Sequence, residues 1–125
     1  MTTLKLLQQE ALIKTGEFDH ADWNYRLLLG GISRSRFNLV KDLIGDRQAK
    51  RILEIGYGSG VFLPELAEHC QEVYGVDVHD KNFEVAEKLA EFGTKANLIS
   101  SGAEKIEVPD NHFDFIVAVL SLIHI

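Results

Sequence analysis

The residues best suited to chemistry lie in one short stretch, Glu54-Ile55-Gly56-Tyr57-Gly58-Ser59-Gly60. Glycine tolerates positive φ and lets a ligand approach the backbone closely. The three glycines alternate, one residue tighter than the G-x-G-x-x-G spacing of dinucleotide sites. Glu54 would be unfavourable beside a pyrophosphate, but it suits a ligand with a positive end, such as an amino acid amine or a sulfonium. The stretch therefore predicts a site for a ligand of that kind.

A second acid follows at an informative distance. Asp77 lies near the end of the apolar run 72–78, 21 residues beyond Gly56. An acid at this place can accept hydrogen bonds from both hydroxyls of a ribose, as in the comparable dinucleotide site. Glu54 and Asp77 are therefore expected at the same edge of a sheet, where the strands of a doubly wound fold receive ligands.

A parallel sheet with flanking helices must position these residues. Runs rich in apolar and β-branched residues predict four strands, at 52–55, 72–78, 96–100 and 113–120. The last run is almost continuously apolar, as expected for a central parallel strand. Helical spacing and turn residues predict four helices, at 4–14, 33–44, 61–70 and 81–92.

Turn residues and helical spacing also define the ends and the inward faces of these helices. The expected helix boundaries are a break at Gly30-Gly31, an end at Gly45, Pro64 in a first turn and Asp80 as a cap. The residues expected to face inward are Leu4, Leu7, Ala11 and Leu12; Phe37, Val40, Leu43 and Ile44; Leu63, Leu66 and Ala67; and Phe83, Ala86, Leu89 and Ala90.

Composition narrows the functional classes. The chain has 125 residues, 46% of them hydrophobic, which suits one small globular domain. Residues 1–51 carry nine Lys/Arg and six Asp/Glu, net +3, and residues 52–125 carry four and thirteen, net −9. An acidic body argues against broad nucleic-acid binding. With one cysteine, no apolar run near 18 residues and no Cys/His cluster, we expect a cytoplasmic protein without a membrane span or a metal site.

Taken as an ordered set, the motifs resemble class I S-adenosylmethionine-dependent methyltransferases, and most closely the small-molecule branch known as methyltransferase type 11. The motifs that carry the resemblance are Glu54–Gly60, Val76-Asp77, Ser101–Glu104, Pro109–Asp114 and the closing Leu120–Ile125. The resemblance covers about residues 50–125, a partial methyltransferase domain. Residues 1–49 are similar to the variable N-terminal helical cap of such enzymes.

The resemblance implies an α/β fold with a Rossmann-like, doubly wound, mainly parallel sheet, and S-adenosyl-L-methionine as cofactor. It implies these cofactor-binding positions: Gly56, Tyr57, Gly58, Ser59 and Gly60 around the methionine part, Glu54 on its amino group, Asp77 on the ribose, Val78 on the adenine, Ala103 and Glu104 at the adenine edge, and Val119 at the methyl-donor end. The family often has an Asp where this chain has Gly102, so one adenine contact differs.

Three side chains, His124 in the closing motif and Trp23 and Tyr25 near the N-terminus, have two interpretations each. His124 is either a structural residue at the end of the fourth strand or a general base near the methyl acceptor, since histidine titrates near neutrality. Trp23 and Tyr25 are either core residues or a lid whose aromatic faces attract the sulfonium.

Only the first four strands of the family's seven, in the order 3-2-1-4-5-7-6, are expected in this chain. The fourth strand would then be an apolar edge, which soluble proteins avoid. We infer a truncated copy, an excised fragment or a chain completed by a partner, with self-association through that edge as one outcome. The leading hypothesis is a methyltransferase acting on a small molecule. The alternatives are a non-catalytic remnant or cofactor-binding module, and a nicotinamide-dependent oxidoreductase.

Overall fold

The computed structural model describes residues 4–13, 15, 27–102 and 112–118, with only the backbone of residues 27–34. Four parallel strands form one sheet in the order β3-β2-β1-β4. The strands are β1 (Ala49–Ile55), β2 (Cys70–Asp77), β3 (Ala96–Ser100) and β4 (Phe115–Ala118). The helices are the 3-10 turn η1 (Gln9–Ala11), α1 (Leu27–Ile44), α2 (Leu63–Ala67) and α3 (Asn82–Glu91). The predicted Rossmann-like half-sheet is therefore confirmed.

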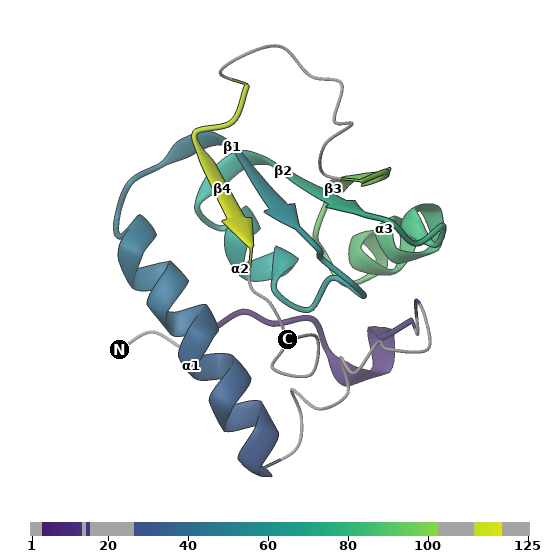
Figure 1. Cartoon of the computed structure of the whole chain (residues 1–125), viewed down its shortest axis with the longest axis horizontal. Helices are drawn as coiled ribbons and strands as arrows, with labels where there is room; N and C mark the ends of the chain where they lie inside the picture. The colour runs from purple at the N-terminus through teal and green to yellow at the C-terminus, as the bar shows by residue number, and fades with distance from the viewer. Residues whose placement is uncertain (1–3, 14, 16–26, 103–111, 119–125) are drawn as a thin grey trace.

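The carboxyl ends of the strands meet at one edge. Ile55 at the end of β1 pairs with Val76 of β2 and with Ala118 of β4. Asp77, the last residue of β2, pairs with Ser100, the last residue of β3. The arrowheads of β1 and β4 accordingly point to the same end of the sheet (Figure 1). The loops that follow β1, β2 and β3 therefore all begin at this edge, where a doubly wound fold binds ligands.

One hydrophobic core joins the sheet to the helices on one of its faces. Its buried members come from every layer and include Ile52, Val73 and Val117 of the sheet, Leu63, Leu66, Val85 and Leu89 of α2 and α3, and Phe37 and Ile44 of α1. The rings of Phe37 and Phe62 stack with centroids 4.4 Å apart, which holds α1 against the turn before α2. Because residues N-terminal to β1 share this core, they help to hold the sheet. The boundary at residues 49/50 stays a prediction.

The predicted helix over residues 4–14 is wrong. The segment is extended on both sides of the short turn η1, with Gln8 and Leu12 in β conformation. Its residue Leu7 is buried, and the Leu7 N–H donates to the carbonyl of Val61 at 2.9 Å. Docking on the turn before α2 thus overrides the helical pattern of the apolar residues, because burial and backbone pairing outweigh weak local propensity.

Helix α1 is longer than predicted. It begins at Leu27 and runs through Gly30-Gly31, so the expected break there is wrong. Gly45, with φ of 65°, ends the helix as predicted, and its N–H donates to the carbonyl of Lys41. Leu43, expected inward, is 67% exposed.

The other two helices are shorter than predicted. Helix α2 keeps Pro64 in its first turn but ends at Ala67, because β2 already begins at Cys70. The N-cap of α3 is Lys81 rather than Asp80, and in the described chain it makes no side-chain cap hydrogen bond. On α3 the inward face contains Val85 and Leu89, whereas the expected Phe83 is 80% exposed and Ala90 is exposed. Within the described residues, none of the helices has the length and apolar character that a membrane span needs.

Candidate functional site

The glycine-rich turn follows β1 at the carboxyl edge of the sheet. Gly56, Gly58 and Gly60 all have positive φ, of 73°, 59° and 85°. This left-handed region is nearly free of strain only for glycine, so the alternating glycines are required by the backbone path. A Cβ on Gly60 would also lie 3.3 Å from side chains of Leu63, Val85 and Leu89. The turn is therefore pressed closely onto the core beneath it.

Hydrogen bonds from the end of β2 hold this turn in place. The Gly56 N–H donates to the carbonyl of Val76 at 2.8 Å. The Gly58 N–H donates to Oδ2 of Asp77 at 2.9 Å, and the Val78 N–H donates to Oδ1 at 2.7 Å. Asp77 thus joins the glycine-rich turn to its own strand, and the structure brings it to Glu54's edge of the sheet as predicted.

His79 is a contact of this turn that the sequence did not reveal. Its Nε2 lies 2.8 Å from the carbonyl oxygen of Gly58, and its ring meets the Tyr57 ring edge to face with centroids 5.1 Å apart. The only sequence signal for this contact is that His79 follows Asp77 by two residues, which keeps it close to the glycine-rich turn.

Buried polar atoms without partners gather at the same turn. In the described chain, four buried side-chain polar atoms lack a hydrogen-bond partner, and three of these are Glu54 Oε1, Tyr57 Oη and Ser59 Oγ. Buried polar groups in native proteins are nearly always paired, and an exception calls for a specific reason. Three exceptions within six residues fit a turn that completes its hydrogen bonds with a polar ligand.

Burial changes the acidity of two of these groups. The pKa of Glu54 is raised to about 8, mainly because burial disfavours the charged carboxylate and also because Asp77 is negative. The pKa of Tyr57 is raised by the same two causes, in the same order. A cation placed beside Glu54 would reverse part of this cost, because an opposite charge favours the ionised carboxylate.

Tyr57 needs a glycine on the neighbouring strand. A Cβ on Gly75 would lie 2.6 Å from Cδ1 of Tyr57 and 2.9 Å from Cδ2 of Leu98, so no larger residue fits without a shift. The Tyr57 ring therefore fills space over β2 and fixes the second residue of the glycine-rich turn. The sequence prediction of a strand here did not foresee this requirement.

The structure brings together most of the predicted cofactor residues. Those at the carboxyl edge are Glu54, Gly56, Tyr57, Gly58, Ser59, Gly60 and Asp77, with Val78 beside them and 79% exposed. Ala103, Glu104, Val119 and His124 lie outside the described residues, as do Trp23 and Tyr25. Across the residues that are described, no group of three or more His, Cys, Asp or Glu side chains is arranged to hold a metal ion.

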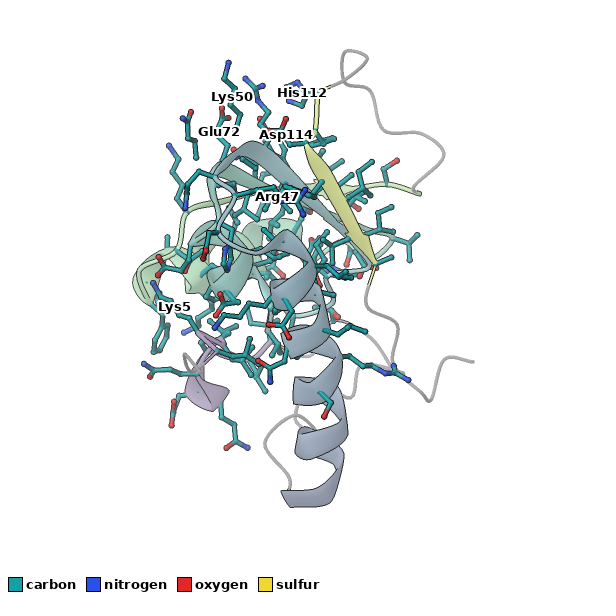
Figure 2. All side chains as sticks on the ribbon, turned by 90° about the vertical axis from the view of Figure 1, so that its left-hand side faces the viewer. Lys5, Arg47, Lys50, Glu72, His112 and Asp114 are labelled. Carbon is teal, nitrogen blue, oxygen red and sulfur yellow. The ribbon has the colours of Figure 1, made fainter. Side chains whose placement is uncertain are left out.

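An acid comparable to Asp77 lies at the opposite end of the sheet, where the strands begin. Asp114, just before β4, accepts hydrogen bonds at Oδ2 from the N–H groups of Lys50 and Arg51, at 2.7 and 3.3 Å. Figure 2 shows Lys50, Glu72, His112 and Asp114 gathered at this end. Asp77 and Asp114 thus both accept two backbone N–H groups, at opposite ends of the sheet.

A family model described as a methyltransferase domain matches residues 52–125. The chain belongs to the methyltransferase domain family. This match begins within β1 and includes the glycine-rich turn, Asp77 and His79, so the site lies inside the matched region. It confirms the resemblance to class I methyltransferases that the motifs carried.

Individual relatives agree with this assignment. The ubiquinone/menaquinone biosynthesis C-methyltransferase UbiE of Azotobacter vinelandii is 31% identical over 102 residues, covering 77% of this chain and 40% of the relative. The ubiquinone biosynthesis O-methyltransferase of Nitrosospira multiformis is 32% identical over 78 residues, covering 61% and 33%. The chain therefore spans less than half the length of these curated relatives.

Solved structures show the same fold. The crystal structure of a SAM-dependent methyltransferase from Aquifex aeolicus matches with a TM-score of 0.60 and 27% identity, covering 82% of this chain and 57% of that one. YcgJ from Bacillus subtilis matches with a TM-score of 0.64 and 24% identity, covering 70% and 38%. The fold of this chain thus corresponds to only a part of each of these longer chains.

Proposed function

We propose that this chain carries the cofactor site of an S-adenosylmethionine-dependent methyltransferase that acts on a small molecule. The observation that carries the proposal is the buried carboxylate of Glu54. Its Oε1 has no partner within the described chain, and it lies at the edge where the glycine-rich turn and Asp77 meet. An amino acid ammonium group would supply both the missing hydrogen bond and the missing charge.

The remaining residues fit the other parts of that cofactor. Each carboxylate oxygen can accept two hydrogen bonds. Asp77 spends one acceptor site per oxygen on the N–H groups of Gly58 and Val78, which leaves one on each for the two ribose hydroxyls. The exposed side chain of Val78 offers an apolar surface for adenine. Ala103, Glu104 and Val119 stay predictions for the adenine edge and the methyl-donor end.

The chemistry asks little of the chain beyond binding and alignment. Bound S-adenosylmethionine supplies a methyl group on a sulfonium, which is already activated for in-line displacement. Holding two reactants in the right geometry supplies about 7–11 kcal/mol in well-oriented systems. The turn between Glu54 and Gly60, which is hydrogen-bonded to Val76 and Asp77, would contribute such alignment. A base is needed only when the acceptor must lose a proton, and His124 stays a candidate for that role.

The acceptor class has weaker support. The relatives carry names from ubiquinone and menaquinone biosynthesis, and these names describe a C-methyltransferase and an O-methyltransferase. These names support a small organic acceptor rather than a nucleic acid, as does the net charge of −6. A cytoplasmic location and self-association through the edge of β4 stay predictions.

The test is calorimetric titration with S-adenosylhomocysteine, comparing wild type, Asp77→Ala and Asp114→Ala. Each substitution removes a carboxylate that accepts two backbone N–H groups, but only Asp77 lies at the carboxyl edge. We expect Asp77→Ala to weaken binding about 10- to 100-fold, the scale of charged hydrogen bonds, and Asp114→Ala to change it less than about twofold.

Three other outcomes separate the alternatives. Equal losses in both variants would mean that binding reports only general stability, and the assigned site would be wrong. Binding without transfer of a labelled methyl group to any tested acceptor would favour a cofactor-binding module. Fluorescence enhancement on addition of NADH, with no S-adenosylhomocysteine binding, would favour the oxidoreductase.

A further inference from the structure

One residue of the glycine-rich turn, Gly58, is held at both its N–H and its carbonyl, by Asp77 at the end of β2 and by His79 two residues further on. The Gly58 N–H donates to Oδ2 of Asp77 at 2.9 Å, and the Gly58 carbonyl lies 2.8 Å from Nε2 of His79. The acid is an expected part of the site, whereas the imidazole has no role in the function proposed above. The imidazole contacts the same residue as Asp77, so it can fix the backbone of Gly58 at the proposed cofactor site.

The partners of the imidazole define its tautomer. A carbonyl oxygen can only accept, so Nε2 of His79 must carry the proton that is donated to Gly58. A backbone N–H can only donate, and the Lys81 N–H lies 3.0 Å from Nδ1, so Nδ1 must be unprotonated. The neutral ring thus satisfies two backbone groups at once, one in the glycine-rich turn and one at the start of α3.

Other contacts hold the ring where it can do this. The Ser100 hydroxyl, at the end of β3, donates to the carbonyl of His79 at 2.8 Å and so fixes its backbone. The Tyr57 ring meets the imidazole edge to face and is itself buried. A histidine anchored at its backbone, at Nδ1 and on one ring edge presents Nε2 to Gly58 in one defined position.

We propose that His79 is a positioning residue for cofactor binding, holding the backbone of Gly58 through its carbonyl so that the turn is formed before the ligand arrives. The proposal rests on the function proposed above and adds a specific residue to it. With the carbonyl of Gly58 engaged by His79, its N–H is held on Asp77, and the carboxylate keeps one orientation toward the ribose. Without this contact, part of the binding free energy is spent on ordering the turn.

Two amide substitutions separate this role from a plain structural one. In His79→Gln, the side-chain nitrogen reaches about as far as Nε2 and keeps the donor for Gly58. In His79→Asn, the side-chain oxygen lies about where Nδ1 lies and keeps the acceptor for the Lys81 N–H. The two variants therefore each preserve one of the two hydrogen bonds, and both keep an uncharged polar side chain.

The experiment measures S-adenosylhomocysteine affinity by calorimetry and the midpoint of thermal unfolding for wild type, His79→Gln and His79→Asn. We expect His79→Gln to bind within about twofold of wild type, although its midpoint falls. We expect His79→Asn to keep its midpoint better and yet bind about 3- to 10-fold more weakly, the scale of one neutral hydrogen bond. The reverse pattern would show that His79 only caps α3, and would overturn the proposal.

A second readout needs no ligand. Amide hydrogen exchange at Gly58 should be faster in His79→Asn than in His79→Gln, because only the first loses the contact to the Gly58 carbonyl. Wild-type binding with equal affinities and equal exchange in both variants would reject the role of His79 alone. Failure of the wild type to bind would instead reject the proposed function, and the role of His79 in cofactor binding with it.

Discussion

Two buried glutamates show the difference between a structural charge and a ligand site. Glu54 and Glu65 are each only 4% exposed. Glu65, on α2, accepts a hydrogen bond at Oε1 from the Lys5 N–H at 2.8 Å, its Oε2 lies 2.7 Å from Nε2 of His69, and the ammonium of Lys41 is 4.0 Å away. Glu54 has an Oε1 without a partner in the described chain.

Burial removes the hydrating water from both carboxylates. The two residues differ in how this loss is compensated. An unpaired buried charge is strongly unfavourable, so a protein either pairs it or shifts its pKa. Glu65 is paired by three different segments of the chain and so ties them together. Glu54 takes the other course, with its pKa raised to about 8. Two glutamates with the same burial thus differ in their hydrogen bonding. Both oxygens of Glu65 have partners, whereas Oε1 of Glu54 has none within the described chain.

The largest loss of stability is expected from Glu65→Ala. Removing the carboxylate leaves the Lys5 N–H and the His69 ring without their acceptor in a partly buried place. We expect the free energy of unfolding to fall by about 3 kcal/mol, within the range for breaking one partner of a buried polar network. Urea unfolding at neutral pH measures it, and Glu65→Gln, which keeps an acceptor oxygen, should lose less. Equal stability of Glu65→Ala and wild type would end the contrast between the two sites.

The second prediction concerns the pH dependence that Glu54 imposes. Its pKa is raised in the folded state, so between its usual value and about pH 8 the folded protein holds a proton that the unfolded chain has released. Stability from this group is therefore present at acidic pH and falls as pH rises, by about 1.4 kcal/mol per pH unit. Glu54→Gln cannot ionise and should remove this slope.

Urea unfolding of Glu54→Gln and wild type between about pH 5 and pH 9 checks the sign. We expect similar stabilities at the acidic end and a more stable variant at the alkaline end. The variant should also bind S-adenosylhomocysteine more weakly, because it cannot supply a charge for the ammonium group. A wild type that becomes more stable with rising pH, relative to the variant, would contradict the raised pKa.

The sheet was predictable from sequence because each strand is a compact apolar run. The run at 96–100 matches β3 in both bounds, and the run at 52–55 lies within β1. The position of Glu54 and Asp77 at the same end of the sheet was predictable too, since parallel strands bring their carboxyl ends together. Such features depend on short local patterns and on a fold rule that leaves few alternatives.

The errors lie where tertiary contacts decide. The segment 4–14 has helical spacing, yet Leu7 pairs with Val61 and the segment is extended. The inward face of α3 contains Val85 rather than Phe83. Packing against the glycine-rich turn and β3 decides which face of the helix is buried. The contacts of His79 were not predicted, because hydrogen bonds to backbone groups leave no pattern of residue types in the sequence.

The smallest effect is expected at Glu68, one turn from the buried Glu65. Its carboxylate lies 2.7 Å from the ammonium of Lys5, but both side chains are about half exposed. The hydrogen bond and charge of Lys5 lower the pKa of Glu68, so any stabilisation is present near neutral pH and is lost as pH falls through the acidic range. Exposed pairs of this kind contribute about 0–1 kcal/mol.

Glu68→Gln should therefore change the free energy of unfolding by less than about 1 kcal/mol, and the change should vanish in about 1 M salt, where the screening length is near 3 Å. The loss in Glu65→Ala should persist at that salt concentration, because buried groups are screened much less. Urea unfolding of both variants at low and high salt makes the comparison. A large, salt-resistant loss in Glu68→Gln would mean that the ammonium of Lys5 holds the N-terminal segment on α2. The expected result assigns that task to the Lys5 backbone N–H and the buried Glu65.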